Sequence, residues 1–291
     1  MADWIEIANG TLTAAINPHG AELSSLKDGE GRELMTDADP AFWTGRAPIL
    51  FPLVGAAYRD TIHVDGGDYT LPKHGFARRS RFDLVAQEAT RAVFALTDDA
   101  DTRAHYPFAF RLEIAFTLDG ATLSIDATIA NPAETPLLAS FGFHPAFAWP
   151  LPYGRDRLDH RITFATDEPE RLSEIAADGT IAAQTRESPL QDRVLALRDD
   201  LFANDALVWP QVRSQQVTYG AADGPHLDIH FPDTPMLGIW TKPGAHYVCV
   251  EPWHGIADPE GYTGAFADKP GVFAVAPGGA KHIGMSVTLV P

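Results

Sequence analysis

The chain has 291 residues, of which 45% are hydrophobic and 21% are charged, a composition typical of a globular protein with a sizeable core. Its 39 acidic and 22 basic residues give a formal net charge of −17. That charge repels polyanions, so nucleic acids are not expected as partners, whereas a small neutral or weakly charged ligand is compatible with it.

Cys249 is the single cysteine, which excludes an intramolecular disulfide and a cysteine-rich zinc site. The first residues lack a basic start followed by an apolar run, and no apolar stretch reaches the length of a membrane span. We therefore expect a soluble, cytoplasmic protein without membrane contacts. Glycine and proline are spread along the whole chain, so residues 1–291 are expected to form one large domain.

The expected elements are short strands separated by turns. Asn9-Gly10 and Asp28-Gly29 are residue pairs that favour chain reversal. Residues 39–43 predict a short helix, with Asp39 as N-cap and Pro40 at the first helical position. Residues 92–96 predict a strand.

The clearest pattern is a hairpin, in which residues 108–118 and 121–129 alternate apolar side chains on either side of Asp119-Gly120. Residues 150–191 are polar and weakly patterned, which predicts an insertion or a long loop, although Asp178-Gly179 within them is another turn signal. Helical periodicity is nearly absent. The predicted fold is all-β, a large antiparallel β-sandwich.

Isolated polar side chains in apolar segments need a partner or a task, because their burial costs free energy. Arg46 lies among aromatic and aliphatic residues 43–55, where it either binds a substrate oxygen or holds a loop through carbonyl groups. His74 follows a proline bend, and His144 ends an apolar strand before a proline. Both are candidate ligand donors, although a single histidine is more often structural.

The apolar strand at residues 247–253 carries a carboxylate near its end. A period of two puts Glu251 on the same face as Cys249. Partial burial raises the pKa of a glutamate toward the range useful for a general base. Trp253 offers a flat surface of the kind that stacks on a sugar ring. The alternative interpretation of Glu251 is an ion pair with Arg46 or another basic residue.

A competing cluster consists of His226, Asp228 and His230, which a strand would align on one face as ligands for a divalent metal. A solvent-facing strand has the same pattern, and neither a fourth ligand nor supporting hydrogen-bond partners are evident. The metal interpretation is the weaker one. No phosphate-binding glycine loop, nucleophilic serine motif or dinucleotide motif is present, so no cofactor is expected.

Together these segments resemble the aldose 1-epimerase (galactose mutarotase) family over nearly the whole chain. The family's arginine, His-Gly histidine, strand-end histidine, late aspartate and final glutamate match, in order, Arg46, His74, His144, Asp205 and Glu251. The glycine-rich turn at residues 276–279 is also similar. The forms Gly142-Phe143-His144-Pro145 and Glu251-Pro252-Trp253 differ from those of the best-known galactose mutarotases and indicate a divergent branch.

The resemblance implies a galactose mutarotase-like supersandwich that interconverts the α and β anomers of an aldohexose without a cofactor. It assigns proton removal from O1 to Glu251, protonation of the ring oxygen to His144 as imidazolium, and charge stabilisation there to His74. The residues it assigns to substrate binding are Arg46, Asp205 and, as a stacking surface, Trp253.

Two alternatives share this fold. A hexose-6-phosphate 1-epimerase would need cations for the phosphate, which Lys73, Arg78 and Arg79 would supply. A non-catalytic carbohydrate-binding sandwich would use aromatic platforms but would require neither the histidines nor the glutamate. In each case the expected partner is a small sugar, and the protein is expected to be a monomer or a homodimer.

Overall fold

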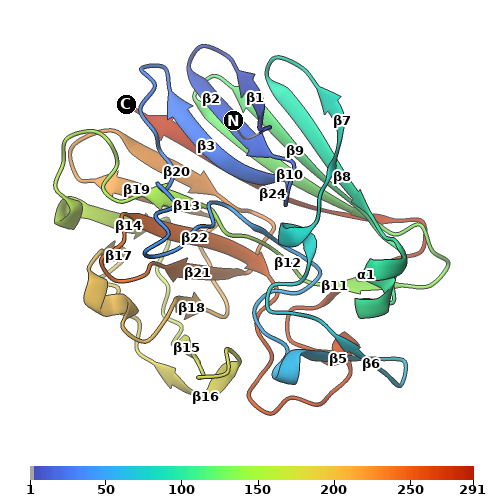
Figure 1. Ribbon diagram of the computed structural model, residues 1–291. Helices are drawn as coiled ribbons and strands as arrows, with labels where there is room; N and C mark the ends of the chain where they lie inside the picture. Colours follow the sequence, from blue (N-terminus) through green and yellow to red (C-terminus); the bar gives the residue numbers. More distant parts are fainter. Residues whose placement is uncertain (1–2) are drawn as a thin grey trace.

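The computed structural model describes residues 3–291, which contain 24 β-strands, one α-helix and five short 3-10 helices (Figure 1). The predicted all-β fold is confirmed. The helix α1 (Ala100–His105) begins with a capping box formed by Asp99 and Thr102. No helix within these residues has the length and apolar character needed to cross a membrane.

The larger of two main sheets contains the predicted hairpin. Strands β9 (Arg111–Asp119) and β10 (Thr122–Ala130) pair from Asp119 opposite Thr122. The turn is Gly120-Ala121, one residue later than predicted, because Gly120 supplies the positive φ of +53° at the first turn position. In spatial order the nine antiparallel strands are β17 (Val194–Ala196), β14 (His160–Phe164), β19 (Gln216–Ala221), β20 (His226–His230), β24 (Ala280–Val290), β10 (Thr122–Ala130), β9 (Arg111–Asp119), β8 (Arg91–Thr97) and β7 (Asp83–Gln87).

The second main sheet has eight strands. In spatial order they are β16 (Ile181–Arg186), β15 (Leu172–Ile175), β18 (Leu207–Trp209), β21 (Met236–Trp240), β22 (Tyr247–His254), β12 (Phe141–Phe143) and β4 (Ile49–Leu50), with β13 (Ala146–Ala148) also paired to β22. The strand β22 therefore has three partners, β21, β12 and β13. This makes it the most extensively paired strand of the sheet.

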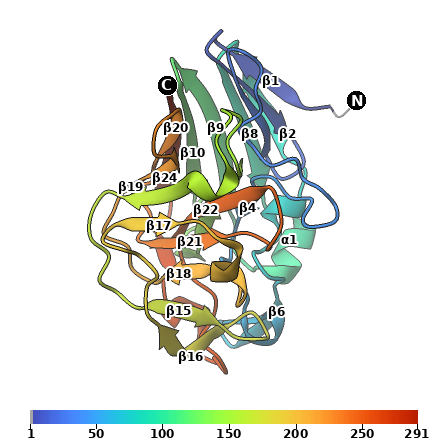
Figure 2. The same cartoon turned by 90° about the vertical axis from the view of Figure 1, so that its left-hand side faces the viewer.

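Three small sheets and the 3-10 helices complete the fold. The small sheets are β1 (Ile5–Ala8), β2 (Leu12–Asn17) and β3 (Glu22–Asp28); β5 (Thr61–Val64) with β6 (Gly67–Thr70); and β11 (Leu137–Ala139) with β23 (Phe273–Val275). The 3-10 helices are Tyr58–Asp60, Ala77–Arg79, Arg157–Asp159, Asp199–Phe202 and Phe266–Asp268. Figures 1 and 2 both place β15 and β16 at the end of the molecule opposite β1 and β2.

The main core lies between the two large sheets. Alternate residues of β9, such as Ile114 and Phe116, are buried, as the period of two predicts. They belong to one continuous cluster with Phe143, Val248 and Val250 from the second sheet. The opposite face of the second sheet is therefore left for other contacts.

Two sequence predictions are wrong. Residues 39–43 form a single turn and not a helix. The N–H groups of Phe42 and Trp43 donate to the carbonyl of Asp39 at 2.9 and 3.0 Å. The chain then leaves the turn, and the N–H of Arg46 donates to the side chain of Glu22. Of the two alternatives expected for residues 150–191, an insertion or a long loop, the loop is wrong, since these residues contain β14, β15 and β16. The exposed, polar β16 lacks the alternation that marks a half-buried strand.

A buried ion pair fixes the loop that follows β22. Lys269 Nζ lies 2.7 Å from Asp258 Oδ1, and the two side chains are 1% and 3% exposed. Asp258 Oδ2 accepts a hydrogen bond from the N–H of Tyr58 at 2.8 Å, and the N–H of Asp258 donates to the carbonyl of Ala56 at 2.8 Å. The pair thus ties this loop to the segment that follows Gly55.

We expect Lys269→Met to lower the free energy of unfolding by about 3–5 kcal/mol, because it leaves the Asp258 carboxylate buried without its cation. Urea unfolding followed by tryptophan fluorescence measures the change. The matched control is Asp200→Ala, which removes an exposed pair with Arg198 and is expected to leave the midpoint unchanged. Equal midpoints for both variants and the original protein would contradict the prediction.

Candidate active site

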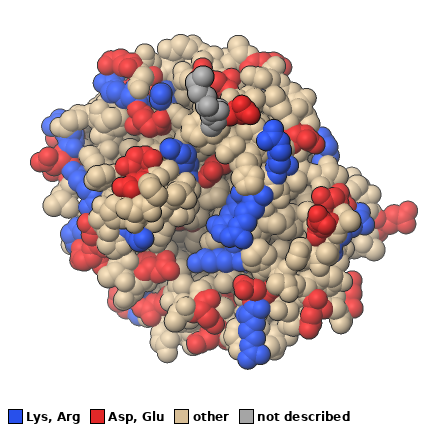
Figure 3. Space-filling model, viewed as in Figure 1, with Lys and Arg blue, Asp and Glu red and all other residues tan. Residues whose placement is uncertain are grey.

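A cavity of about 410 Å³ lies on the face of the second sheet that points away from the main core. Val248 and Val250 of β22 point into the core, so the residues that alternate with them along the strand point toward the other face. Glu251 is one of them and lines the cavity. Figure 3 shows a hollow near the middle of the molecule, with Lys and Arg side chains gathered beside it.

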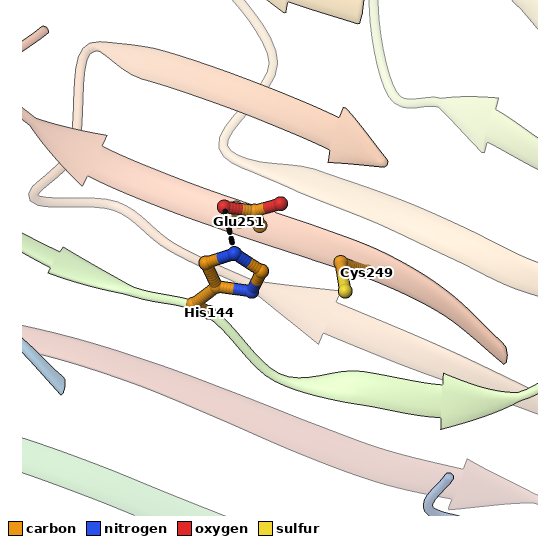
Figure 4. A group of neighbouring side chains, drawn as sticks. All are labelled: His144, Cys249 and Glu251. Carbon is orange, nitrogen blue, oxygen red and sulfur yellow. Dashed lines mark ion pairs between the residues drawn. The ribbon is translucent and has the colours of Figure 1, made fainter. Parts of the chain in front are cut away.

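The cavity contains a buried histidine–carboxylate pair. His144 Nε2 lies 3.1 Å from Glu251 Oε2, and the side chains are 9% and 3% exposed (Figure 4). Glu251 comes from β22, whereas His144 lies between β12 and β13, where the carbonyl of Pro145 accepts a hydrogen bond from Val250. The two predicted proton-transfer residues are therefore brought together from opposite sides of one strand pairing.

Burial opposes charge on both members of the pair. It lowers the pKa of His144 to about 3 and raises the pKa of Glu251 well above its ordinary value. The cation of Lys73 opposes the rise in the Glu251 pKa, and the carboxylate of Asp205 adds to it. Because the groups are in contact, they titrate as a unit, and the form with one proton on the pair is favoured over a wide pH range.

His74 is held in one tautomer by the backbone. Its ring Nδ1 accepts a hydrogen bond from the backbone N–H of Gly55 at 3.1 Å, and the backbone N–H of His74 donates to the carbonyl of Gly55 at 2.8 Å. Burial and the neighbouring His144 lower the pKa of His74 well below its ordinary value, so the ring is neutral. Its proton therefore sits on Nε2, which makes His74 a hydrogen-bond donor to a ligand.

The backbone at His74 is strained, with a φ of +67°, and the following Gly75 has a φ of +69°. A Cβ atom at Gly75 would lie 2.2 Å from the carbonyl oxygen of Phe51, so only glycine fits there. Asp205, which also lines the cavity, has a φ of +72°. Left-handed non-glycine residues are often found at functional sites.

Trp253 lines the cavity but lies flat against its own sheet. A Cβ atom at Gly142 would come within 2.6 Å of the indole, and one at Gly238 within 2.5 Å. Two glycines on the neighbouring strands β12 and β21 thus make room for the ring. This packing explains the Gly142-Phe143-His144 sequence, in which the glycine accommodates Trp253 and the histidine faces Glu251.

The structure corrects the expectation for Arg46, which does not line the cavity. Its Nη1 donates to the carbonyl of Thr36 at 2.7 Å and its Nη2 to that of Asp37 at 3.3 Å. This is the loop-holding role that the sequence left open, and no ion pair with Glu251 forms. The cations that do line the cavity are Lys73 and Arg78.

The second proposed cluster is not brought together as a metal site. In this cluster of His226, Asp228 and His230, Asp228 accepts a hydrogen bond from Thr218 at 2.6 Å. The Nδ1 atom of His226 lies 3.3 Å from the carbonyl of Gly224. Among residues 3–291 the group with three neighbouring ligand atoms is instead His144, Cys249 and Glu251.

Sequence reasoning missed the aromatic walls. The ring of Trp43 lies 5.0 Å from that of His144 and 5.5 Å from that of Trp240, which it meets edge-on. Trp240 reaches the site through pairing of β21 with β22, where it lies opposite Cys249. No local pattern marks such a residue, because its position depends on which strand pairs with which.

Comparison with known proteins agrees with this geometry. The sequence model of the family described as aldose 1-epimerase matches residues 3–261. The chromosomal protein LacX of Lactococcus lactis subsp. lactis is 30% identical in an alignment 286 positions long, which covers 94% of this chain and 95% of LacX.

Two solved structures are similar over their full length. A galactose mutarotase related enzyme from Lactobacillus acidophilus has a TM-score of 0.90 at 30% identity, with 99% of this chain and 97% of that chain covered. A galactose mutarotase-like protein from Lactobacillus casei has a TM-score of 0.92 at 26% identity, with coverage of 99% and 100%. With these strands, this buried pair and these relatives, the chain belongs to the aldose 1-epimerase family.

Proposed function

We propose that the protein is a mutarotase, an aldose 1-epimerase that interconverts the α and β anomers of an aldohexose. The observation that carries this proposal is the 3.1 Å contact between buried His144 and Glu251 in a cavity of about 410 Å³, a volume in the range of small-molecule sites. A carbohydrate-binding module without catalysis would not need this pair.

Anomer exchange requires one proton to leave O1 and another to reach the ring oxygen. A pair that holds one proton and one free lone pair supplies both groups at once. Glu251 takes the proton from O1, the C1–O1 double bond forms as the C1–ring-oxygen bond breaks, and His144 donates its proton to the ring oxygen. Rotation about C1–C2 and the reverse transfers give the other anomer.

The reactive form has the pair's proton on His144 and a charge on Glu251. The proton reaches His144 across the 3.1 Å contact. The cation of Lys73 favours the ionised form of Glu251, because it lowers the pKa of Glu251 against the effect of burial. The hydroxyl groups of the sugar also stabilise the form with the proton on His144. The imidazolium is thus formed within the occupied site, because burial disfavours it in the empty one.

Other cavity residues position the sugar. The Nε2–H of His74 donates to the ring oxygen as negative charge develops there. Asp205, which lines the same cavity as Glu251, accepts hydrogen bonds from sugar hydroxyl groups. Trp43, Trp240 and Trp253 provide apolar surfaces for the C–H faces of the ring.

A hexose 6-phosphate is the second candidate substrate, and one observation favours it. Lys73 and Arg78 line the cavity, and within residues 3–291 neither has an ion-pair partner. Two unpaired cations beside one cavity are unusual in a chain with a net charge of −17. Arg79, the third cation considered from the sequence, lies outside the lining.

We expect Glu251→Gln to lower kcat/KM for anomer exchange by about 10²–10⁴-fold, because it removes the general base while keeping the side-chain volume. Polarimetry and NMR of α-glucose and α-galactose measure the rate above the spontaneous one. Glu134→Gln, on an exposed loop, is the matched control. If the original protein accelerates neither sugars nor sugar phosphates, the binding-module interpretation replaces this one.

The pH dependence of kcat/KM should show a broad plateau. Activity falls at low pH when His144 and Glu251 both hold protons, and at high pH when the pair has lost its only proton. Burial moves the first limb down and the second limb up, since it lowers the pKa of His144 and raises that of Glu251.

Two charge variants should move the upper limb in opposite directions. Asp205→Asn removes a like charge, lowers the pKa of Glu251 and shifts the limb to lower pH; Lys73→Met removes an opposite charge and shifts it to higher pH. The position of the limb is the readout, because both variants also change substrate binding. Shifts in the same direction would show that Glu251 does not set this limb.

The ratio of kcat/KM for glucose 6-phosphate to kcat/KM for glucose distinguishes the two candidate substrate classes. If the phosphate is the substrate, kcat/KM for glucose 6-phosphate exceeds that for glucose, and Arg78→Met lowers this ratio by at least about tenfold through a lost charged hydrogen bond. Arg79→Met serves as the control and should leave the ratio unchanged. A preference for free glucose that Arg78→Met does not alter would exclude the phosphate.

A further inference from the structure

The group formed by His144, Cys249 and Glu251 suggests a property beyond proton transfer. We propose that these three side chains form an inhibitory binding site for a thiophilic divalent cation, with Zn²⁺ as the best-fitting ion. Binding of the cation does not depend on the proposed reaction, but its inhibitory effect rests on that proposal.

The geometry comes from one strand and one neighbouring segment. Cys249 and Glu251 are two residues apart on β22, so they share a face, and His144 approaches them from the segment between β12 and β13. Figure 4 shows the three side chains converging, and one ligand atom of each lies within 4.8 Å of the other two. All three residues are buried.

These separations are close to those of a bound ion. Bond lengths of about 2.0–2.3 Å to N, O and S place the ligands of tetrahedral zinc about 3.3–3.7 Å apart. The His144–Glu251 contact of 3.1 Å is near this range, and a side-chain movement of about 1 Å brings the Cys249 sulfur into it. The site therefore requires rotamer adjustment but no change of the backbone.

The donor set selects the class of ion. One thiolate, one imidazole and one carboxylate suit Zn²⁺ or Co²⁺, whereas Mg²⁺ and Ca²⁺ require oxygen ligands in larger number. His144 and Glu251 line the cavity, which gives the ion a path from solvent. Three protein ligands leave a fourth position, facing the cavity, for water or a sugar hydroxyl group.

Unsatisfied polar atoms surround this group. In the described part of the chain, His144 Nδ1 and the hydroxyl of Tyr247 are buried without a hydrogen-bond partner. Because no protein group fixes Nδ1, the ring can adjust toward a cation. Tyr247 projects from the same face of β22 as Cys249 and can donate to a ligand of the ion or to its bound water.

The consequence for catalysis is direct competition. A cation coordinated by Glu251 and His144 occupies the lone pairs that take up and return the proton, so the pair no longer acts as base and acid. The cation and the transferable proton cannot occupy the pair together. We therefore expect Zn²⁺ at micromolar or lower concentrations to suppress anomer exchange, and a chelator to restore the activity.

The first experiment measures binding without activity. Co²⁺ added to the metal-free protein is expected to give one thiolate-to-cobalt charge-transfer band at one equivalent, which Zn²⁺ displaces. The band disappears in Cys249→Ser and in Cys249→Ala and is retained in His230→Ala, the control for ordinary imidazole binding on β20. Absence of the band in the original protein, or its survival in both Cys249 variants, would overturn the proposal.

The second experiment tests inhibition, with each protein compared with its own metal-free rate. Cys249→Ser should raise the zinc concentration for half-inhibition by at least about tenfold, whereas His230→Ala should not change it. Equal inhibition of the original protein and Cys249→Ser would overturn the inhibitory role. A protein without any anomer exchange would refute the proposed function alone, because the cobalt band still decides whether the site exists.

Discussion

The site depends on strand β22, which packs into the core with one face and lines the cavity with the other. Val248 and Val250 fill the core between the large sheets, while Glu251, one residue on, lines the cavity and contacts His144. Pairing with β21, β12 and β13 leaves the strand no freedom to slip, because a shift of one residue would exchange the two faces. Core packing and catalytic geometry are therefore fixed together.

Desolvation, and not a strong local charge, sets the protonation of the site. His144 and Glu251 are both buried, and both are pushed toward their neutral forms. His74 is neutral for the same reason, and Gly55 fixes which nitrogen carries its proton. The result is a buried pair in which both members favour their neutral forms, with a histidine beside it whose Nε2 carries a proton.

The sequence identified His74, His144 and Glu251, which the structure brings to one cavity, because the signals that mark these residues are local. Glu251 and His144 lie at strand ends beside prolines, and His74 precedes a glycine that only a positive φ explains. Arg46 and Arg78 could not be told apart, since the difference between them is whether loop carbonyls such as that of Thr36 capture the guanidinium. Such partners are set by tertiary folding alone, as is the sheet pairing that places Trp240.

The β15–β16 hairpin forms a part of the cavity wall that lies far from the buried pair in the strand order. It supplies Ile175, Gly179 and Ile181 to the cavity wall, yet it forms the outer edge of its sheet, far along the strand order from β22 (Figure 2). Substitutions there can change this wall of the cavity while the contact between His144 and Glu251 stays in place. The outer wall of the cavity is thus structurally separate from the strand that holds Glu251, and the two can change independently.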